Sequence, residues 1–253
     1  MTDTTTRART AIVTGSASGI GAATVLELAR QGYRTVGIDI NAEGAQATAR
    51  EAAHINALMH TSCSADVSDE PQVVKAFEQA LAFLGRLDVL VTSAGVAETT
   101  PFMDIPVASF RSVYEINVIG TFLCIREAAK RMQTGGRICT IASVAGLRGG
   151  GLSGTAAYAA SKGGVLALTK SAARALAAQG ICVNTIAPGA TLTPMIAEHW
   201  KNDAHRTRVE SMSVLNRTAQ AGEIASGIAF LVSPQASAIT GSTLVADNGL
   251  MMY

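Results

Sequence analysis

The sequence predicts an α/β fold in which a doubly wound, seven-stranded parallel sheet is covered by helices on both faces. Short apolar runs alternate along the chain with longer segments of helical spacing. The runs are nearly continuous in apolar residues, which indicates strands that are buried on both faces. The first run ends in a glycine-rich turn that opens a helix. Because the 253 residues contain no linker, repeat or low-complexity tract, we expect a single domain, 1–253.

The elements follow one another in a regular order. A strand at 11–13 leads through the turn into a helix at 20–30, which ends near Gly32. A second strand at 35–38 ends at Asp39, and an alanine-rich helix at 43–53 follows it. The remaining expected strands are 58–64, 89–92, 137–142, 181–186 and 242–245, and the remaining helices are 70–84, 109–132, 156–179 and 221–232.

The stretch 190–215 breaks this alternation. It contains Pro194, a polar run at 199–203 and scattered methionines, and it reads as the main irregular part of the chain. A long excursion from a compact fold is typical of a lid or a binding loop. We therefore expect a substrate lid at about 190–215.

Composition excludes several classes of protein. Hydrophobic residues make up 48% of the chain and charged residues 15%, which is typical of a globular protein and not of a disordered one. The net charge is +1 and the basic residues are dispersed, so we expect no nucleic-acid partner. No apolar run approaches membrane-spanning length and the first ten residues lack a signal-peptide core, so we expect no membrane partner and a cytoplasmic location. The four cysteines and four histidines lack metal-ligand spacing, so we expect reduced thiols and no metal.

The turn at 14–21, Thr-Gly-Ser-Ala-Ser-Gly-Ile-Gly, lies between the first strand and the first helix. Backbone N–H groups and the helix dipole can hold a pyrophosphate there. Asp39, at the end of the next strand, can accept hydrogen bonds from ribose hydroxyls and would repel a 2′-phosphate. The turn itself offers no lysine or arginine, and Arg34 is better explained as a surface charge. These features predict a dinucleotide site that prefers NAD, with NADP the less favoured cofactor.

Tyr158 and Lys162 are four residues apart, with Ser143 fifteen residues before the tyrosine. On a helix, side chains at this spacing share one face, where an ammonium can lower the proton affinity of the phenol. A free tyrosine, with a pKa near 10, is a poor base at neutral pH. An activated one can move a proton off an alcohol. Alone the pair is weak evidence, and its weight comes from the dinucleotide motif upstream.

Taken in order, these residues resemble the short-chain dehydrogenase/reductase family in its single-domain form, over about 10–249. The matching motifs are 14–21, Asp66-Val67, Asn117, Ser143, Tyr158-x-x-x-Lys162, Pro188-Gly189 followed by Thr191, and Ile239-Thr240-Gly241. The resemblance implies a Rossmann-like fold, hydride transfer between NAD(H) and a secondary alcohol or ketone, and a homotetramer. We expect the apolar tail at 250–253 to pack at a subunit interface.

The resemblance implies four catalytic residues. Tyr158 would be the general acid/base, Lys162 would favour its phenolate and bind the ribose, and Ser143 would donate a hydrogen bond to the substrate oxygen. Asn117 would hold a water that links Lys162 to solvent. Taken in isolation, Ser143 is better explained as a turn residue at a strand end, and Asn117 as a helix cap or kink. Their order with Tyr158 and Lys162 reverses that preference.

A larger set of residues is implied for the cofactor. It comprises Gly15, Ser18, Gly19, Ile20, Gly21, Asp39, Asp66, Val67, Ala94, Gly95, Tyr158, Lys162, Pro188, Gly189 and Thr191. Asp66 would bond the adenine amino group. A helix N-cap is nearly as good an interpretation of Asp66, because the segment 68–71, Ser-Asp-Glu-Pro, also reads as a helix start.

Three segments depart from the family pattern. The segment 92–95 is Thr-Ser-Ala-Gly where the family has Asn-Asn-Ala-Gly, and 247–249 is Asp-Asn-Gly where it has Asp-Gly-Gly. The interval from Ser143 to Tyr158 is slightly longer than usual and contains Arg148 followed by three glycines, which bears on the substrate side. The substrate candidates are Arg148, Met195, His199 and Trp200. Arg148 could recognise an anion, as could a basic cluster at 201–208, although a solvated helix face explains the cluster more simply.

The sequence thus predicts an NAD-dependent oxidoreductase of secondary alcohols and ketones. One alternative is a reductase of 3-oxoacyl thioesters of acyl carrier protein or coenzyme A, which the acidic Asp39 disfavours because such biosynthetic reductases use NADPH. The other is a dinucleotide-sensing protein without turnover. The retention of Ser143, Tyr158 and Lys162 disfavours the sensor, which has no need of proton-moving groups.

Overall fold

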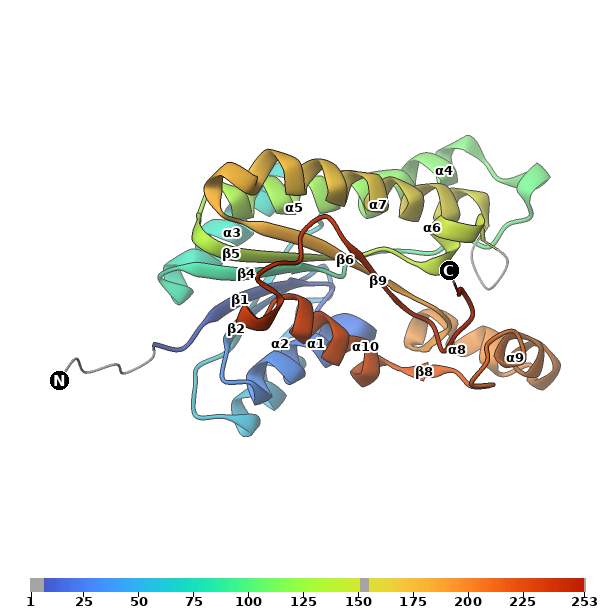
Figure 1. The fold of residues 1–253 in the computed structure, drawn as a ribbon, viewed down its shortest axis with the longest axis horizontal. Helices are drawn as coiled ribbons and strands as arrows, with labels where there is room; N and C mark the ends of the chain where they lie inside the picture. The colour runs from blue at the N-terminus through green and yellow to red at the C-terminus, as the bar shows by residue number, and fades with distance from the viewer. Residues whose placement is uncertain (1–6, 151–154, 253) are drawn as a thin grey trace.

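The structure, a computed structural model, describes residues 7–150 and 155–252, and of Glu198 and His199 it describes the backbone alone. A seven-stranded parallel sheet with strand order β3-β2-β1-β4-β5-β6-β9 forms its centre (Figure 1), which confirms the predicted fold class. Its strands are β1 Thr10–Thr14, β2 Arg34–Asp39, β3 Thr61–Ser64, β4 Leu87–Thr92, β5 Met132–Ile141, β6 Cys182–Pro188 and β9 Thr243–Ala246.

Helices form a layer on each side of the sheet. In Figure 1, α3, α4, α5, α6 and α7 lie above it, and α1, α2 and α10 lie below. The helices are α1 Gly19–Arg30, α2 Ala42–Ile55, α3 Glu70–Leu84, α4 Val107–Tyr114, a π-helix at Glu115–Ile119, α5 Gly120–Ala129, α6 Val144–Arg148, α7 Ala156–Leu176, α8 Pro194–Trp200, α9 Asp203–Glu210 and α10 Ala221–Leu231. No helix in the described part of the chain combines the length and apolarity that a bilayer crossing requires.

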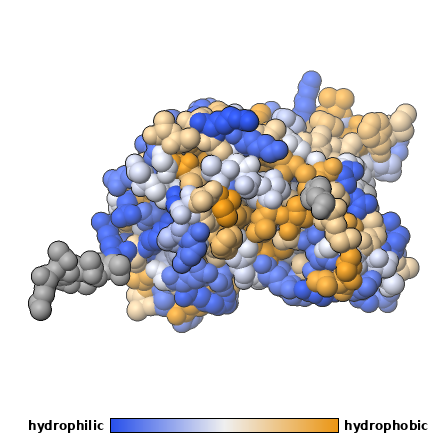
Figure 2. Space-filling view, in the orientation of Figure 1, coloured by the Kyte–Doolittle hydropathy of each residue, from blue (hydrophilic) through white to orange (hydrophobic). Residues whose placement is uncertain are grey.

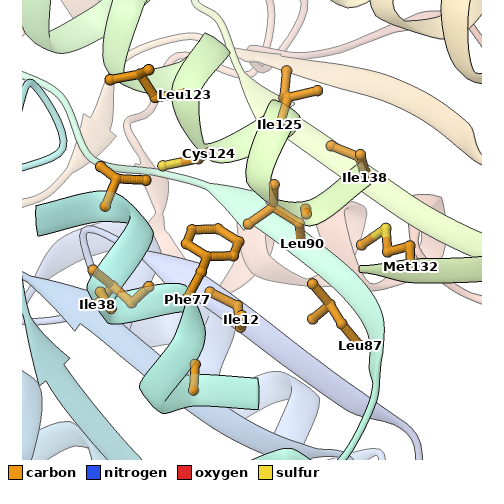
Figure 3. Close-up of a cluster of buried hydrophobic side chains, with 14 of the residues drawn as sticks. Ile12, Ile38, Phe77, Leu87, Leu90, Leu123, Cys124, Ile125, Met132 and Ile138 are labelled. Atoms are coloured by element: carbon orange, nitrogen blue, oxygen red, sulfur yellow. The ribbon is translucent and has the colours of Figure 1, made fainter. Parts of the chain in front are cut away.

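Two hydrophobic cores hold these layers together, one on each face of the sheet. On the upper face, Phe77 of α3 packs with Leu90 of β4, Leu123 of α5 and Ile138 of β5 (Figure 3). On the lower face, α1 and α10 pack against strand residues such as Val89. Full burial of each large side chain is worth about 1.5–3 kcal/mol. The sheet is therefore a rigid platform that fixes where its strands end.

The order of the strands creates a crevice. β1 pairs with β2 on one side and with β4 on the other, so the chain leaves β1 and β4 in opposite directions across the sheet. In doubly wound sheets, ligands bind where the order reverses, beyond the carboxyl ends of the strands. Thr14, Asp39, Thr92 and Ile141 all end strands at this edge. The edge is where the predicted site should form.

The expected helix at 109–132 is wrong in two respects. α4 passes into a π-helix around Asn117 before α5 begins, and α5 ends at Ala129 so that β5 starts as early as Met132. The apolar spacing of this stretch is compatible with one continuous helix. In the π-helix, Asn117 bonds residues far away in the sequence, and a local pattern does not contain such contacts.

The expected strand at 58–64 begins only at Thr61. The preceding residues are held as a loop by Asn56, whose side-chain oxygen accepts a hydrogen bond from the N–H of Leu58 at 2.8 Å. The His60 ring bridges Asn56 at 2.9 Å and Thr35 at 2.7 Å. These side-chain bonds compete with strand pairing, and they shorten β3 at its start.

The stretch expected to be irregular, 190–215, contains α8 and α9 instead. Its base is closed by a second small sheet, in which β7 Thr191–Leu192 pairs with β8 Ala219–Gln220. Trp200 packs with Ile196 and Val209, and its indole N–H donates to the Thr218 hydroxyl at 3.0 Å. We refer to residues 190–220 as the cap segment. Short helices with a core of their own explain why the periodicity of the main sheet is lost there.

Hydrophobic residues gather at one end of the face seen in Figure 2, where α4, α8 and α9 lie. Exposed large hydrophobic residues in these helices and in the segments just before them include Phe102, Met103, Val107, Leu192 and Met195. In the expected interface tail, Met252 is exposed, and Tyr253 lies outside the described residues.

Candidate active site

A cavity of about 470 Å³ lies at the carboxyl edge of the sheet, across the point where the strand order reverses. Sixteen of the predicted site residues line it, namely Gly15, Ser18, Gly19, Ile20, Asp39, Asp66, Val67, Ala94, Gly95, Ser143, Tyr158, Lys162, Pro188, Gly189, Thr191 and Met195. Gly21, Asn117, Arg148 and Trp200 are not among the lining residues. His199 lies on α8, and its side chain is outside the described part of the structure.

The glycine-rich turn from β1 to α1 packs with almost no room for side chains. The N–H of Gly15 donates to the Ile38 carbonyl at 2.8 Å, and its φ of +70° belongs to the left-handed region that favours glycine. A Cβ on Gly15 would lie 2.6 Å from the backbone nitrogen of Ala94. A Cβ on Gly21 would lie 1.9 Å from the Gly15 carbonyl oxygen. These glycines therefore let the turn close against the β4 loop and open toward the cavity.

The carboxylate of Asp39 is held in place by the backbone of the turn. One oxygen accepts a hydrogen bond from the N–H of Ala17 at 2.9 Å, and the other accepts one from the N–H of Asn41 at 2.8 Å. Asn41 in turn caps α2 through the N–H of Gly44. The end of β2 thus presents a preorganised anion at the cavity wall.

Asp66 lies at the same wall, beyond β3. One of its oxygens accepts hydrogen bonds from the N–H and the hydroxyl of Ser68, at 2.9 and 2.7 Å. The N-cap of α3 is Asp69, which accepts from the N–H of Gln72 at 3.0 Å. The two interpretations of Asp66 are therefore separated by the structure, because the capping role belongs to Asp69.

Tyr158 lies in the first turn of α7 and faces Ser143. Burial raises the pKa of the Tyr158 phenol, and a hydrogen bond with the Ser143 side chain lowers it in part. Ser143 is also the N-cap of α6, where its hydroxyl oxygen accepts from the N–H of Ala145 at 3.1 Å. The helix α6 was not expected from the sequence. Ser143 is thus both a turn residue at the end of β5 and a hydrogen-bond partner of the Tyr158 phenol.

Lys162 lies one helical turn after Tyr158 and is buried, with 6% of its surface exposed. Its ammonium donates to the Ile141 carbonyl at 2.8 Å and lies 5.7 Å from the centre of the Tyr158 ring. Burial lowers the pKa of Lys162 to about 8, because the charged form loses hydration. The sequence predicted that this lysine lowers the pKa of Tyr158. In the folded protein, burial is the largest influence and raises the pKa of the phenol, and the hydrogen bond with Ser143 lowers it in part.

Asn117 is fully buried in the π-helix. Its side-chain oxygen accepts from the N–H of Val96 at 2.9 Å, and its amide nitrogen donates to the Val96 carbonyl at 2.9 Å. The same nitrogen donates to the Ser161 hydroxyl at 2.9 Å. Sequence reasoning missed Val96 and Ser161. The one available signal for Ser161 was its position three residues after Tyr158, from which a serine can bond back to a helix carbonyl. That signal is slight.

Of the described residues that depart from the family pattern, Ser93 lies at the cavity wall, whereas Asn248 and Arg148 are not among its lining residues. Within the described structure, the hydroxyl of Thr92 is buried without a hydrogen-bond partner, while Ser93 lines the cavity. Asn248 has φ of +59°, which asparagine tolerates, as expected. Arg148, in the last turn of α6, is exposed, and the glycine-rich loop that continues from it at 151–154 lies outside the described residues.

The fold is a doubly wound sheet with a glycine-rich turn at its crevice and an aspartate after β2. The same cavity contains a serine, a tyrosine and a lysine. Together these features define a nicotinamide dinucleotide oxidoreductase. Comparison with known proteins makes this specific. A family model described as "Enoyl-(Acyl carrier protein) reductase" matches residues 15–251. The chain belongs to the short-chain dehydrogenase/reductase family, whose dehydrogenases use a nicotinamide dinucleotide.

The chain is 40% identical over 247 residues to cis-4-hydroxycyclohexanecarboxylate dehydrogenase of Sinomonas cyclohexanicum, covering 95% of this chain and 96% of that protein. It is 37% identical over 246 residues to D-threitol dehydrogenase of Mycolicibacterium smegmatis, covering 95% and 92%. The crystal structure of a short-chain dehydrogenase/reductase titled "SDR:Glucose/ribitol dehydrogenase", from Brucella melitensis, superposes with a TM-score of 0.90 at 32% identity and 97% coverage of both chains.

Proposed function

We propose that this chain transfers a hydride between NAD(H) and a secondary alcohol or ketone, with Tyr158 as the general acid/base. The observation that carries the proposal is one cavity lined by the phosphate turn, Asp39, Ser143, Tyr158 and Lys162. A cofactor site and a set of proton-moving groups in a single cavity are what a hydride-transfer enzyme requires.

The cavity fits a dinucleotide. The turn that contains Gly15 and Gly19 lies at the N-terminus of α1, and its glycines carry no side chains that would cover the backbone. Exposed backbone at a helix N-terminus suits a pyrophosphate. Asp39 would accept from the ribose hydroxyls, and Asp66 with Val67 would hold the adenine. Pro188, Gly189 and Thr191, with Ala94 and Gly95, would surround the nicotinamide.

The preference for NAD over NADP rests on charge. The charged residues that line the cavity in the described part of the chain are Asp39, Asp66 and Lys162. Two carboxylates at the ends of β2 and β3 would repel a 2′-phosphate. Lys162 extends from α7 and already donates to Ile141 beside the tyrosine, so it is not a partner for that phosphate.

The bound nicotinamide supplies the hydride chemistry, which leaves one proton to the protein. Tyr158 would remove the proton of the alcohol in oxidation and return it to the ketone oxygen in reduction. Ser143 would donate a hydrogen bond to the substrate oxygen as charge develops on it. With its pKa at about 8, Lys162 remains mainly protonated at neutral pH and provides the fixed positive charge that a phenolate needs beside it.

We further propose that the substrate is uncharged around its reacting carbon. The wall near Ser143 and Tyr158 includes Val96, Ala145 and Ile196, and no arginine is among the described residues of the cavity wall. The sequence of the undescribed loop at 151–154 is Gly-Leu-Ser-Gly, which carries no ionisable side chain. This apolar wall suits a neutral alcohol better than the anion for which Arg148 was a candidate.

The test mixes the protein with NAD or NADP and a panel of secondary alcohols, and separately with NADH or NADPH and 3-oxoacyl thioesters, and follows the absorbance of the reduced nicotinamide. The panel includes neutral cyclic alcohols, polyols and hydroxycarboxylates, as the names of the two relatives suggest. A Tyr158→Phe control should retain NAD binding and lose turnover by at least about 10²-fold. Turnover limited to 3-oxoacyl thioesters with NADPH would favour the biosynthetic reductase. Tight NAD binding without turnover of any substrate would favour the sensor.

A further inference from the structure

A buried polar chain joins two parts of the cavity wall from behind. The Ser161 hydroxyl donates to the carbonyl of Tyr158 at 2.8 Å and accepts from the side-chain nitrogen of Asn117 at 2.9 Å. The Asn117 amide also holds both the N–H and the carbonyl of Val96, each at 2.9 Å. We call these residues the Val96–Asn117–Ser161 chain. It runs from the loop after β4, through the π-helix, to the first turn of α7.

Neither the Asn117 side chain nor the Ser161 side chain is exposed to solvent. Asn117 and Ser161 both have 0% of their surface exposed, so each of their polar atoms depends on partners within the protein. The bond from Ser161 to Tyr158 is local to the helix. The bond between Asn117 and Ser161 joins residues 44 positions apart, and it ties α7 to the π-helix. Removal of the Ser161 hydroxyl leaves one buried amide hydrogen of Asn117 without an acceptor.

The Val96–Asn117–Ser161 chain packs directly against the predicted catalytic centre. A Cβ on Gly95 would lie 3.0 Å from the side-chain oxygen of Asn117 and 3.6 Å from the Lys162 ammonium. Gly95 therefore lies between Asn117 and Lys162, and its lack of a side chain lets the two approach each other. A shift of Asn117 or Ser161 would be transmitted to Gly95 on one side and to the Tyr158 backbone on the other, because packed interiors leave little room for independent movement.

We propose that Ser161 is a positioning residue, which holds the first turn of α7 against the 94–96 loop so that the Tyr158 phenol is kept in register with the nicotinamide side of the cavity. Ser161 is not a lining residue of the cavity and acts only through Tyr158 and Asn117. This inference rests on the proposed acid/base role of Tyr158. Its consequence is that loss of the hydroxyl should impair the proton-transfer step more than cofactor binding.

The experiment compares three variants. Ser161→Ala removes both hydrogen bonds with little change of volume, and Ser161→Thr retains a hydroxyl for rescue. The matched control is Thr169→Val, because Thr169 is also fully buried on α7 and its hydroxyl bonds the Val165 carbonyl at 2.8 Å and Thr140 at 2.7 Å. It therefore removes a similar pair of bonds, two helical turns beyond Ser161. Should Ser161→Ala not fold, Ser161→Cys, whose thiol is a weak donor, takes its place with the same expectation.

In Ser161→Ala we expect kcat for alcohol oxidation to fall by about 10- to 100-fold, while the Kd for NAD stays within about twofold. The limb of the pH profile that reports the base should move to higher pH, since Tyr158 would be held less well beside Ser143. Thr169→Val should keep the wild-type kcat and pH profile, and Ser161→Thr should recover most of the loss. An unchanged kcat and profile in Ser161→Ala, or an equal loss in Thr169→Val, would overturn the inference.

A readout that needs no turnover separates this inference from the proposed function. Ultraviolet difference titration, with Tyr158→Phe subtracted, reports the ionisation of Tyr158 alone. If the wild-type protein oxidises no alcohol, the proposed function fails. The positioning of Tyr158 is still tested by this titration, in which a higher pKa in Ser161→Ala supports it and an unchanged pKa refutes it.

Discussion

Lys162 is a buried ammonium, and its replacement by methionine should stabilise the protein while impairing the proposed reaction. Burial lowers the pKa of this lysine from 10.5 to about 8, so the folded state holds the proton less tightly than the unfolded chain does. Lys162→Met has a side chain of similar length without a charge to desolvate. Functional residues often carry such a stability cost.

The size of the effect follows from the difference between the two pKa values. The difference, 10.5 minus about 8, is about 2.5. At 1.36 kcal/mol for each pKa unit, the proton costs the folded state roughly 3.4 kcal/mol at neutral pH. The methionine also loses the hydrogen bond to the Ile141 carbonyl, which is worth about 1 to 1.5 kcal/mol. We therefore expect Lys162→Met to raise the free energy of unfolding by roughly 2 kcal/mol at neutral pH.

The pH dependence gives the prediction its sign. Between about pH 8 and 10.5 the unfolded chain binds more protons at Lys162 than the folded protein does, so the stability of the wild type rises with pH in this window. The variant lacks this rise. Its advantage should vanish within the window, and above pH 10.5 the wild type should be more stable, by about the value of the lost hydrogen bond. The buried thiols of Cys124 and Cys139, with pKa values raised to about 12, titrate in both proteins and cancel in the difference.

Urea unfolding of both proteins at one protein concentration, at neutral pH and at about pH 10, measures this difference. Circular dichroism follows unfolding, and turnover is measured in parallel. A variant that is less stable than the wild type at neutral pH, or a stability difference that does not change with pH, would refute the reasoning. Either result would mean that Lys162 is hydrated or electrostatically compensated in the folded protein.

Three further perturbations test the cofactor and cap regions. Gly21→Ala places a Cβ 1.9 Å from a carbonyl oxygen, so it should lower stability by about 2 kcal/mol or more and weaken NAD binding. The control is Gly222→Ala, whose Cβ would have no atom within 4 Å and which should be near neutral in thermal denaturation. Asp39→Ser removes the carboxylate and should shift the ratio of kcat/KM for NAD to that for NADP toward NADP by at least about tenfold, ~1.4 kcal/mol. Trp200→Phe loses the 3.0 Å bond to Thr218, so limited proteolysis should cut the cap segment about fivefold faster, as a loss of ~1 kcal/mol implies; equal cleavage would show that this bond does not hold the segment.

The elements that sequence predicted well are those whose signal is local. The strand at 89–92 lies within β4, and the helix at 70–84 matches α3 at both ends, because apolar period and capping residues act over a few positions. The errors occurred where a distant side chain intervenes. Asn56 shortens β3, and Asn117 lies within a π-helix where a continuous helix was expected.

The candidate site followed the same division. The turn at 14–21, Asp39 and the pair Tyr158 and Lys162 are short patterns, and all of them except Thr14, Ser16, Ala17 and Gly21 reach the cavity wall. Ser161 escaped notice although it adjoins Lys162, because its importance comes from Asn117, 44 residues away. The cap segment was located correctly as an interruption, but its helices and its Trp200 core were not foreseen.

By itself the sequence determined the doubly wound α/β fold, the glycine-rich turn after the first strand and the identity of the chemical groups, since periodicity, glycine placement and residue type are properties of short segments. The tertiary structure decided which of those groups meet, and how burial sets their proton affinities. The pKa of Tyr158 is the clearest case. A helical spacing of four residues predicted that Lys162 would lower it. In the folded protein, desolvation by all the atoms packed around the phenol raises this pKa, and a hydrogen bond with Ser143 lowers it in part.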